Sequence, residues 1–313
     1  MKEIKLKSFD NKNIHLYIWD NVKNPKAVLQ IVHGSAEHMK RYETFAKFLN
    51  ANNLIVIGND HRGHGKTIDI REDIGFFAKK NGWNKLVDDL KVVNNFIYKN
   101  YSNSNIMMFG HSMGSFLVRH YITLYSNTIK AAIICGTAWN PVIQVWFAKQ
   151  IASFISKFKS LKKPCDFIHN LSYKKFSKKI NIKDNDLAWL SRDIEVQNNF
   201  LKDPLSGQVF TASAFKDMFN GLLYIYKKKN IIKTRKDLPL FFIAGENDPV
   251  GNLGKWVKKT ANKYKKLNFS YIDIKLYPEM RHEILNEINK EIVYEDILNF
   301  LNNNLENKEL KNE

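Results

Sequence analysis

The sequence predicts an α/β fold in which helices cover both faces of a mostly parallel, eight-stranded sheet. Eight short apolar or alternating runs occur along the 313 residues, and most are separated by longer segments of helical period. Repeated strand–helix units favour a parallel sheet, because each crossover between parallel strands places a helix on one of its faces.

The first half of the chain supplies six of the expected strands. "IKLKSF" and "IHLYIW" alternate around "DNKN" and predict a hairpin. "AVLQIVH" (27–33) and "NLIVIGND" (53–60) read as buried strands, with the amphipathic helix "YETFAKFLNANN" between them. "NKLVDDLKVVNNFIYKNY" (84–101) predicts a helix that places Leu86, Leu90, Val93 and Ile97 on one face. The strand before Ser112, the helix "SFLVRHYITLYS" and the strand "IKAAIICGT" (129–137) follow.

The alternation stops at residue 138 and resumes at 238. "LPLFFIAGEND" (238–248) and "NFSYIDIKLYP" (268–278) predict the last two strands, and a final helix begins near Asn289. Residues 139–237 hold 19 Lys or Arg against 8 Asp or Glu, and "PVIQVWFAKQIASFISKF" (141–158) is an aromatic-rich helix candidate. We therefore expect a core domain of residues 1–137 and 238–313, with an inserted, mainly helical cap at 138–237.

Composition excludes several classes of protein. The net charge of +18 comes with no zinc spacing and no RNA-binding aromatic motif, so we expect no nucleic-acid partner. The uneven basic excess instead favours attraction to anionic lipid headgroups at the cap. The start of the chain lacks a signal-peptide pattern, no apolar run is long enough to span a bilayer, and Cys135 and Cys165 form no disulfide framework. We expect a cytoplasmic protein that contacts the membrane surface peripherally.

The segment "FGHSMGS" (109–115) carries the first chemical signal. Gly110-His111-Ser112-Met113-Gly114 fits G-x-S-x-G, in which a serine nucleophile lies on a sharp strand-to-helix turn. A serine hydroxyl needs a base, an acid that orients the base, and donors for the oxyanion. His282 follows the strand 268–278 and supplies the base. Asp248 follows the strand 238–248 and supplies the acid, with Glu246 as a rival candidate.

The order Ser112, Asp248, His282 is that of the α/β-hydrolase fold. The turn "HGSAEH" (33–38) after an early strand suggests that the amides of Ser35 and Met113 form the oxyanion hole. Glu37 and Arg41, spaced i, i+4, could brace this turn with His111 nearby. Alternatively, they form an ordinary solvated pair.

The four histidines of the two turns invite a metal interpretation, which we do not adopt. His61 and His64 lie near His33 and His38 in the predicted fold, but Gly63 and Gly65 indicate a tight turn at the end of a strand rather than a ligand set. We expect no metal site and no organic cofactor.

Five motifs together resemble the monoacylglycerol lipase and lysophospholipase branch of the α/β-hydrolase superfamily, also grouped with serine aminopeptidase-like hydrolases. They are "HGSAEHMKRY" (33–42), "NDHRGHGKT" (59–67), "GHSMGS" (110–115), "AGENDPVG" (244–251) and "RHEILNE" (281–287). The resemblance implies the same triad of Ser112, Asp248 and His282 and the same oxyanion amides of Ser35 and Met113. It also implies that residues 138–237 form a cap that covers the site and admits lipid.

The expected activity is hydrolysis of a single-acyl lipid ester, a monoacylglycerol or lysophospholipid, through an acyl-enzyme. A short-chain carboxylesterase, a serine aminopeptidase and a catalytically silent binding protein are the alternatives. The aromatic residues Trp146, Phe147, Phe154 and Phe158 have two interpretations: they pack the cap onto the core, or they form an acyl-binding or membrane-facing surface.

Overall fold

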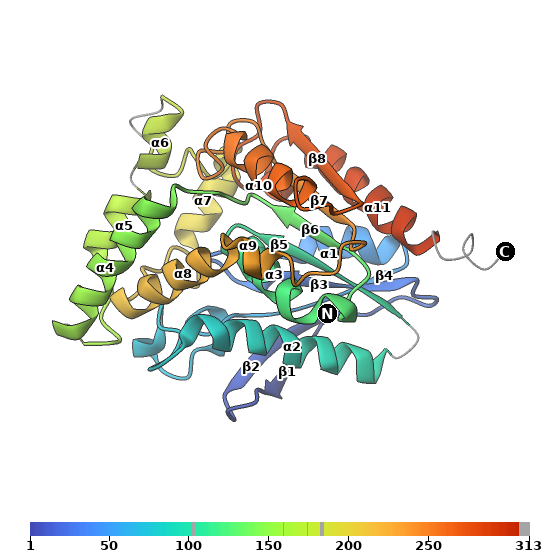
Figure 1. Cartoon of the computed structure of the whole chain (residues 1–313). Coiled ribbons are helices and arrows are strands. Elements are labelled where there is room, and N and C mark those ends of the chain that lie inside the picture. Colours follow the sequence, from blue (N-terminus) through green and yellow to red (C-terminus); the bar gives the residue numbers. More distant parts are fainter. Residues whose placement is uncertain (102–103, 159, 174, 182–184, 307–313) are drawn as a thin grey trace.

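The computed structural model describes residues 1–101, 104–158, 160–173, 175–181 and 185–306 (Figure 1). Its strands form one eight-stranded sheet with the order β1-β2-β4-β3-β5-β6-β7-β8. Only the pairs β1–β2 and β2–β4 are antiparallel. The mostly parallel, eight-stranded sheet that the sequence predicts is therefore confirmed. The strands are β1 (Lys2–Lys7), β2 (Asn13–Trp19), β3 (Ala27–Val32), β4 (Leu54–Asn59), β5 (Asn105–His111), β6 (Ala132–Cys135), β7 (Leu240–Gly245) and β8 (Ile272–Tyr277).

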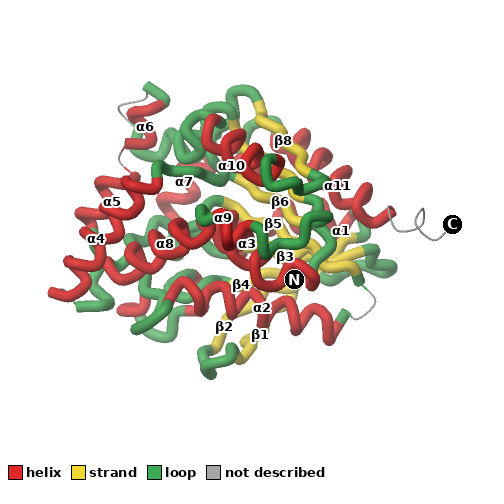
Figure 2. Tube along the Cα trace, viewed as in Figure 1, coloured by secondary structure: helices red, strands yellow, loops and turns green. Residues whose placement is uncertain are grey.

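Helices lie on both faces of the sheet (Figure 2). Two apolar cores result, one on each face: α2, α3 and α10 contribute to one, and α1 and α11 to the other. These helices are α1 (Glu43–Ala51), α2 (Gly82–Asn100), α3 (Met113–Tyr125), α10 (Lys255–Lys265) and α11 (Lys290–Glu306). Short 3-10 turns at Met39–Tyr42, Gly65–Thr67, Arg71–Asp73, Ser126–Thr128 and Ile284–Asn286 complete the connections.

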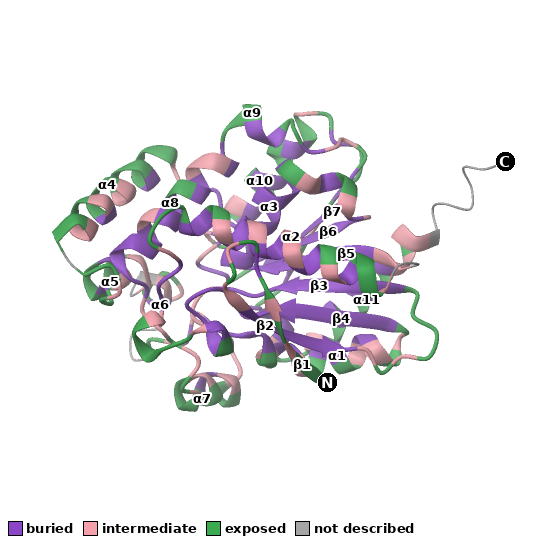
Figure 3. Ribbon diagram, turned by 90° about the horizontal axis from the view of Figure 1, so that it is seen from below, coloured by how far each residue is buried: buried purple, intermediate pink, exposed green. Residues whose placement is uncertain are grey.

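The central strands are apolar at consecutive positions because both of their faces are covered. In β3, Val28 packs into the core that contains α2 and α3, whereas Leu29 packs into the core that contains α1 and α11. Side chains alternate between the two faces along a strand, so a strand buried on both faces needs an apolar run rather than an alternating pattern. Figure 3 shows these strands as almost wholly buried.

Residues 138–237 leave the sheet after β6 and return to it at β7. Among the described residues of this block, helices and turns predominate, and an isolated bridge joins Pro164 to Thr211. The helices are α4 (Val142–Phe158), α5 (Asp166–Tyr173), α6 (Lys175–Lys179), α7 (Ile194–Lys202), α8 (Ala212–Ile225) and α9 (Lys228–Ile231). Helix α8 packs against α2 and α3 of the core and also against α4. The helices α4, α5 and α6 lie beyond one end of the sheet (Figure 1).

Helix α4 is apolar on both of its faces. Val145 and Ala152, seven residues apart, are buried towards α8. Bulky side chains on the remaining surface are 39–75% exposed: Ile143, Trp146, Phe147, Ile151, Phe154 and Phe158. The four aromatic residues singled out in the sequence therefore do not pack the block onto the core. Within the described parts of the chain, no helix combines the length and apolarity that crossing a membrane requires.

Candidate active site

Ser112 occupies the turn between β5 and α3 in a strained conformation. Its backbone has φ 53° and ψ −119°, a region that residues with a side chain rarely adopt. The turn is tight, since a Cβ atom on Gly110 of β5 would collide with the carbonyl oxygen of Gly114, and a Cβ atom on Gly114 would collide with the carbonyl oxygen of Val32 in the neighbouring strand β3. The amide of Ser112 donates to the carbonyl oxygen of Cys135 at 2.9 Å. This geometry presents the hydroxyl at the carboxyl end of the sheet.

The structure brings His282 and Asp248 together from the turns after β8 and β7. The His282 Nδ1 atom lies 3.0 Å from Asp248 Oδ1, and both side chains are almost fully buried. The distance is within hydrogen-bond reach, although the ring is not aligned for a straight N–H···O bond in this conformation. Asp248 Oδ1 also accepts from the amide of Val250 at 2.8 Å. The rival acid Glu246 is exposed to solvent.

His282 and Ser112 border the same cavity of about 250 Å³. The His282 ring lies against the ring of His111, with centroids 4.7 Å apart, and that residue directly precedes Ser112. The His282 ring also contacts the ring of Trp189, with centroids 5.2 Å apart. The amide of His282 donates to the carbonyl oxygen of Trp189 at 3.3 Å, so residues from 138–237 contribute a wall of the site.

Ser35 and Met113 border the position of the nucleophile from two sides. A Cβ atom built on Gly34 would lie 3.2 Å from Ser112 Cβ, so the turn that carries Ser35 passes directly over the serine. Met113 is the first residue of α3, where helical amides have no partner within the helix. In the described part of the chain, neither amide donates to a backbone or side-chain acceptor. Both are available for an oxygen atom of a substrate.

Glu37 belongs to the turn 33–38, is buried, and accepts four hydrogen bonds. Its Oε1 atom accepts from the amide of Gly34 at 2.5 Å, the hydroxyl of Tyr42 at 2.9 Å and His111 Nδ1 at 3.1 Å. Its Oε2 atom accepts from Arg41 at 3.1 Å. Burial raises the pKa of the Glu37 carboxyl, but the bond from His111 and the charges of His111 and Arg41 outweigh burial and hold that pKa well below its ordinary range. The interpretation of Glu37 and Arg41 as a solvated pair is wrong.

His111 faces an acceptor with each of its ring nitrogens. Nδ1 lies against Glu37 Oε1, and Nε2 lies 3.2 Å from the carbonyl oxygen of His282. Both nitrogens can donate only if the ring is protonated. Burial alone lowers the pKa of His111, but the hydrogen bond to Glu37 and the negative charge of Glu37 outweigh it and raise that pKa above its ordinary value. Below the ordinary histidine pKa of 6.5, His111 and Glu37 therefore form a buried imidazolium–carboxylate pair next to His282.

Glu283 is a residue of this network that the sequence reasoning missed. Its two oxygens accept from the two terminal nitrogens of Arg41 at 2.5 and 2.7 Å, and its amide donates to the carbonyl oxygen of Leu190 at 2.8 Å. Arg41 thus joins Glu37 to the residue that follows His282. The position of Glu283 directly after His282, in "RHEILNE", is the only signal in the sequence that could have indicated it.

The buried histidines after β3 and β4 support the turn through hydrogen bonds. His33 Nδ1 donates to the carbonyl oxygen of Gly34 at 2.8 Å, and its Nε2 accepts from the amide of His61 at 2.9 Å. Burial lowers the pKa of His61 to about 3 and that of His64 to about 4, so both rings are neutral. Across the described ranges, no group of three or more His, Cys, Asp or Glu residues could hold a metal ion.

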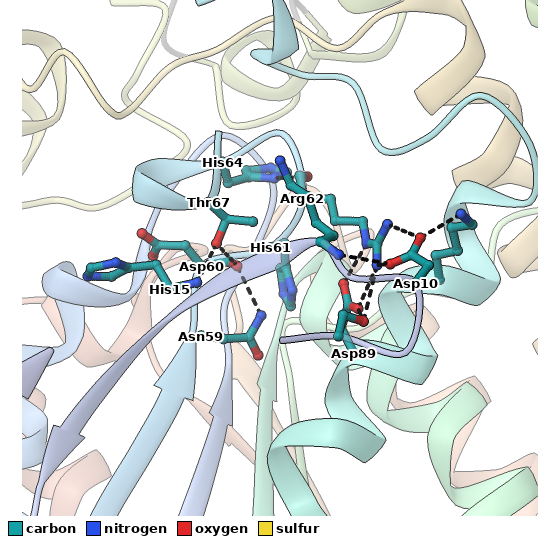
Figure 4. Close-up of polar contacts among 12 residues, drawn as sticks. Asp10, His15, Asn59, Asp60, His61, Arg62, His64, Thr67 and Asp89 are labelled. Carbon is teal, nitrogen blue, oxygen red and sulfur yellow. Dashed lines mark hydrogen bonds and ion pairs between the residues drawn. The ribbon is translucent and has the colours of Figure 1, made fainter. Parts of the chain in front are cut away.

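The loop after β4 is itself anchored by a buried ion pair (Figure 4). Arg62 Nε donates to Asp89 Oδ2 at 2.7 Å, and its terminal nitrogens donate to Asp10 at 2.7 and 2.9 Å. On the other side of the loop, Asp60 accepts from the amides of Met39 at 2.8 Å and Lys66 at 2.7 Å. These contacts fix His61, and through it His33.

The cavity beside Ser112 opens beneath α5 and α7 rather than beneath α4. Its described lining includes the α5 residues His169, Asn170 and Tyr173, the α7 residue Phe200, and Asp186. None of the described lining residues belongs to 141–158. Helix α5 instead presents Phe167 and Leu171 to solvent, while His169, Asn170 and Tyr173 line the cavity.

Comparison with known proteins gives a consistent result. A family model described as serine aminopeptidase, S33, matches residues 23–289. The chain is similar to a monoacylglycerol lipase of Mycolicibacterium smegmatis, with 24% identity over 293 residues, 91% of each chain. It is 30% identical to a monoglyceride lipase of Rattus norvegicus over 105 residues, 34% of this chain and 33% of the relative. A thermostable carboxyl esterase from Bacillus coagulans, solved in complex with glycerol, superposes with a TM-score of 0.88 and 25% identity over 97% of this chain and 98% of its own.

Proposed function

The chain belongs to the serine aminopeptidase S33 family, as its motifs suggested, and from this premise we propose that it is a serine hydrolase that cleaves the ester bond of monoacylglycerol-type lipids. The proposal draws on the matched family, on the relatives that are named as monoacylglycerol or monoglyceride lipases, and on the site around Ser112. Ser112, His282 and Asp248 are the proposed triad.

The reaction follows from the roles of these groups. His282 takes the proton of Ser112 as the hydroxyl oxygen attacks the ester carbonyl, and the amides of Ser35 and Met113 donate to the resulting oxyanion. The tetrahedral intermediate collapses, the C–O bond to glycerol breaks, and His282 returns the proton to the leaving alcohol. Water, deprotonated by His282, then cleaves the acyl-enzyme. Asp248 keeps the proton of the imidazole on Nδ1 and stabilises the positive charge that His282 carries between the steps.

The contact of His282 with Asp248 beside the strained Ser112 carries the proposal. A fluorophosphonate probe tests it, because such probes react only with an activated serine. We expect labelling of the wild type and none of Ser112→Ala, together with loss of hydrolysis of a monoacylglycerol. Equal labelling of the two proteins would refute the assignment of the nucleophile.

The cavity favours an uncharged headgroup over a phosphate. None of the described residues that line the cavity is Lys or Arg, whereas three of them, Glu37, Asp186 and Glu283, are acidic. A phosphate beside Ser112 would need a cationic partner. A monoacylglycerol is therefore preferred over a lysophospholipid of the same acyl length. Rates on a matched pair of the two lipids test this, and faster cleavage of the lysophospholipid would contradict it.

Residues 138–237 act, in this proposal, as a cap that meets a lipid surface through α4. Five of its exposed apolar side chains recur every three or four residues, at Ile143, Phe147, Ile151, Phe154 and Phe158. Such a stripe, in a block with a net basic charge, fits an anionic interface. Lipid drawn there would lie next to α5, whose inner face lines the cavity.

Vesicle binding tests the lipid surface. We expect Phe147→Ser/Phe154→Ser to lose binding to vesicles of phosphatidylglycerol and phosphatidylcholine, with turnover of a soluble ester unchanged. Tyr98→Ser/Tyr271→Ser, which removes two aromatic rings exposed elsewhere on the molecule, is the matched control. Vesicle binding that survives the α4 substitutions would exclude this surface.

An aminopeptidase is the second candidate, because a substrate ammonium needs a carboxylate and the cavity contains three. Two of these are already engaged: Glu37 by His111 and Arg41, and Glu283 by Arg41. Asp186 remains at the exposed rim. Parallel assays of an aminoacyl amide and a long-chain acyl ester decide between the two activities, and an acetyl ester in the same series identifies a general short-chain esterase.

A further inference from the structure

The turn that carries the proposed oxyanion donor is held by side chains and backbone of the block 138–237. Tyr173 of α5 places its hydroxyl 3.0 Å from the hydroxyl of Ser35. The amide of Gly207 donates to the carbonyl oxygen of Ala36 at 2.8 Å. His38 Nε2 lies 2.6 Å from Asp203 Oδ2.

From these contacts we propose that Tyr173 and Asp203 are positioning residues, which hold the turn 33–38 so that the amide of Ser35 faces the reacting carbonyl. The proposal rests on the function proposed above. It gives the cap a role in the chemical step in addition to covering the site: seating of the cap completes the oxyanion hole.

The core fixes the turn at Gly34 and at Glu37, on either side of Ser35 and Ala36. The amide of Gly34 donates to Glu37, and the carbonyl oxygen of Gly34 accepts from His33. The next two residues, Ser35 and Ala36, have their contacts with the cap. Ala36 has φ 57°, a left-handed conformation that costs free energy for an alanine and persists only where neighbours enforce it. The bond from Gly207 to the Ala36 carbonyl supplies such enforcement.

Asp203 is well suited to hold His38, because its carboxylate is itself fixed. Oδ1 accepts from the amide of Leu205 at 2.9 Å, and Oδ2 accepts from the hydroxyl of Ser206 at 2.7 Å. Burial raises the pKa of the Asp203 carboxyl, but the hydrogen bonds from His38, Leu205 and Ser206 outweigh burial and lower it. The His38 ring is buried and the Asp203 side chain is 25% exposed, so their contact is partly shielded from water. The segment 203–207 thus contacts the turn at two positions, Ala36 through the amide of Gly207 and His38 through the carboxylate of Asp203.

Two substitutions test the proposal without removing a catalytic group. Asp203→Ser keeps an oxygen that can accept from the amide of Leu205 but is too short to reach His38. Tyr173→Phe removes only the hydroxyl that contacts Ser35. Asp193→Ser is the matched control, because Asp193 lies in the same block and accepts from the amide of Glu195 at 2.8 Å, and serine can replace it as a helix cap.

The assay is hydrolysis of p-nitrophenyl acetate, whose acyl group is too short to need the apolar surface of the cap. We expect kcat to fall about tenfold in Asp203→Ser and in Tyr173→Phe, less than the 100- to 1000-fold typical of losing an oxyanion donor outright. KM should stay within twofold. Trifluoroacetone, the trifluoromethyl ketone that matches the acetyl group, forms a tetrahedral adduct with serine. Its dissociation constant should rise by the same factor as kcat falls. Asp193→Ser should match the wild type in all three.

Several results would overturn the proposal. They are wild-type kcat in both test variants, a loss confined to KM, or an equal loss in Asp193→Ser. Thermal unfolding of each variant separates a local effect from general destabilisation, since a positioning effect lowers kcat at temperatures where the fold is intact. Failure of the proposed function is distinct: the wild type itself would then be neither labelled by the fluorophosphonate nor active on any ester.

Discussion

Replacing Glu37 by glutamine removes one negative charge from the centre of the buried network beneath the active site. Glutamine has the same shape and can still accept from the amide of Gly34 and the hydroxyl of Tyr42. It cannot balance the charges of His111 and Arg41, whose nitrogens both lie 3.1 Å from the carboxylate. Arg41 retains its two bonds to Glu283, so the change falls mainly on His111.

The expected cost follows from this burial. Breaking a buried ion pair by neutralising one partner typically costs about 3–5 kcal/mol. For 313 residues, an unfolding entropy of about 2.1 cal/mol/K per residue gives a fall in Tm of about 1.5 °C for each kcal/mol. We therefore expect Glu37→Gln to lower Tm by about 5–8 °C near pH 6.

The pH dependence of this loss has a definite sign. The pKa of Glu37 is depressed, so its contribution to stability is present above its ordinary value of 4.5 and is lost as pH falls through the folded value. The pKa of His111 is raised, so its contribution is complete below its ordinary value of 6.5 and is lost as pH rises through the folded value. The difference between wild type and variant should be greatest between about pH 4.5 and 6.5.

Calorimetric melting of both proteins from pH 5 to 9 measures this difference. Glu43→Gln is the control, because Glu43 forms only an exposed i, i+4 pair with Lys47, worth a few tenths of a kcal/mol. A Tm difference that is the same at pH 6 and pH 9, or no larger than that of the control, would refute the account of Glu37 and His111 as a charged pair.

Further predictions concern the triad and the framework. Asp248→Asn should lower kcat by about 10⁴-fold through the wrong imidazole tautomer, while Glu246→Gln stays near the wild type; comparable losses in the two would reopen the choice of acid. Gly114→Ala should destabilise the fold by about 1–3 kcal/mol or more, since its Cβ meets rigid backbone, and an unchanged Tm would contradict the packing described. Arg62→Met should lower the free energy of unfolding by about 3–5 kcal/mol, because it leaves the buried Asp89 carboxylate without a cationic partner, and an unchanged Tm would contradict this account.

The sheet could be predicted because each strand is indicated by the pattern of apolar residues within its own short segment. A run such as "AVLQIVH" has one physical interpretation once helical segments flank it on both sides, and β3 occupies all but its last residue. The strand "NFSYIDIKLYP" shows the limit of this reasoning. Only Ile272–Tyr277 pair with β7, because the length of an edge strand depends on its single neighbour.

The site could be predicted only as far as motifs fix the position of a residue on the chain. Motif spacing predicts Ser112, Asp248 and His282 as the triad, but it could not foresee that Arg41 bonds to Glu283, 242 positions away. The contact of His38 with Asp203 was equally hidden, because residues 138–237 carry few motifs and their packing depends on the finished core.

The charge balance around His282 offers a physical reason for the acidic groups that gather at the proposed active site. The His111 ring is 4.7 Å from the His282 ring, and at an effective dielectric constant of 20 two unit charges at this separation repel by about 3.5 kcal/mol. An unbalanced imidazolium at His111 would therefore oppose the protonation of His282 and slow the reaction by a few hundredfold. Glu37 neutralises His111, and Glu283 neutralises Arg41. In the proposed mechanism, the carboxylate of Asp248 is then left to stabilise the charge that His282 acquires.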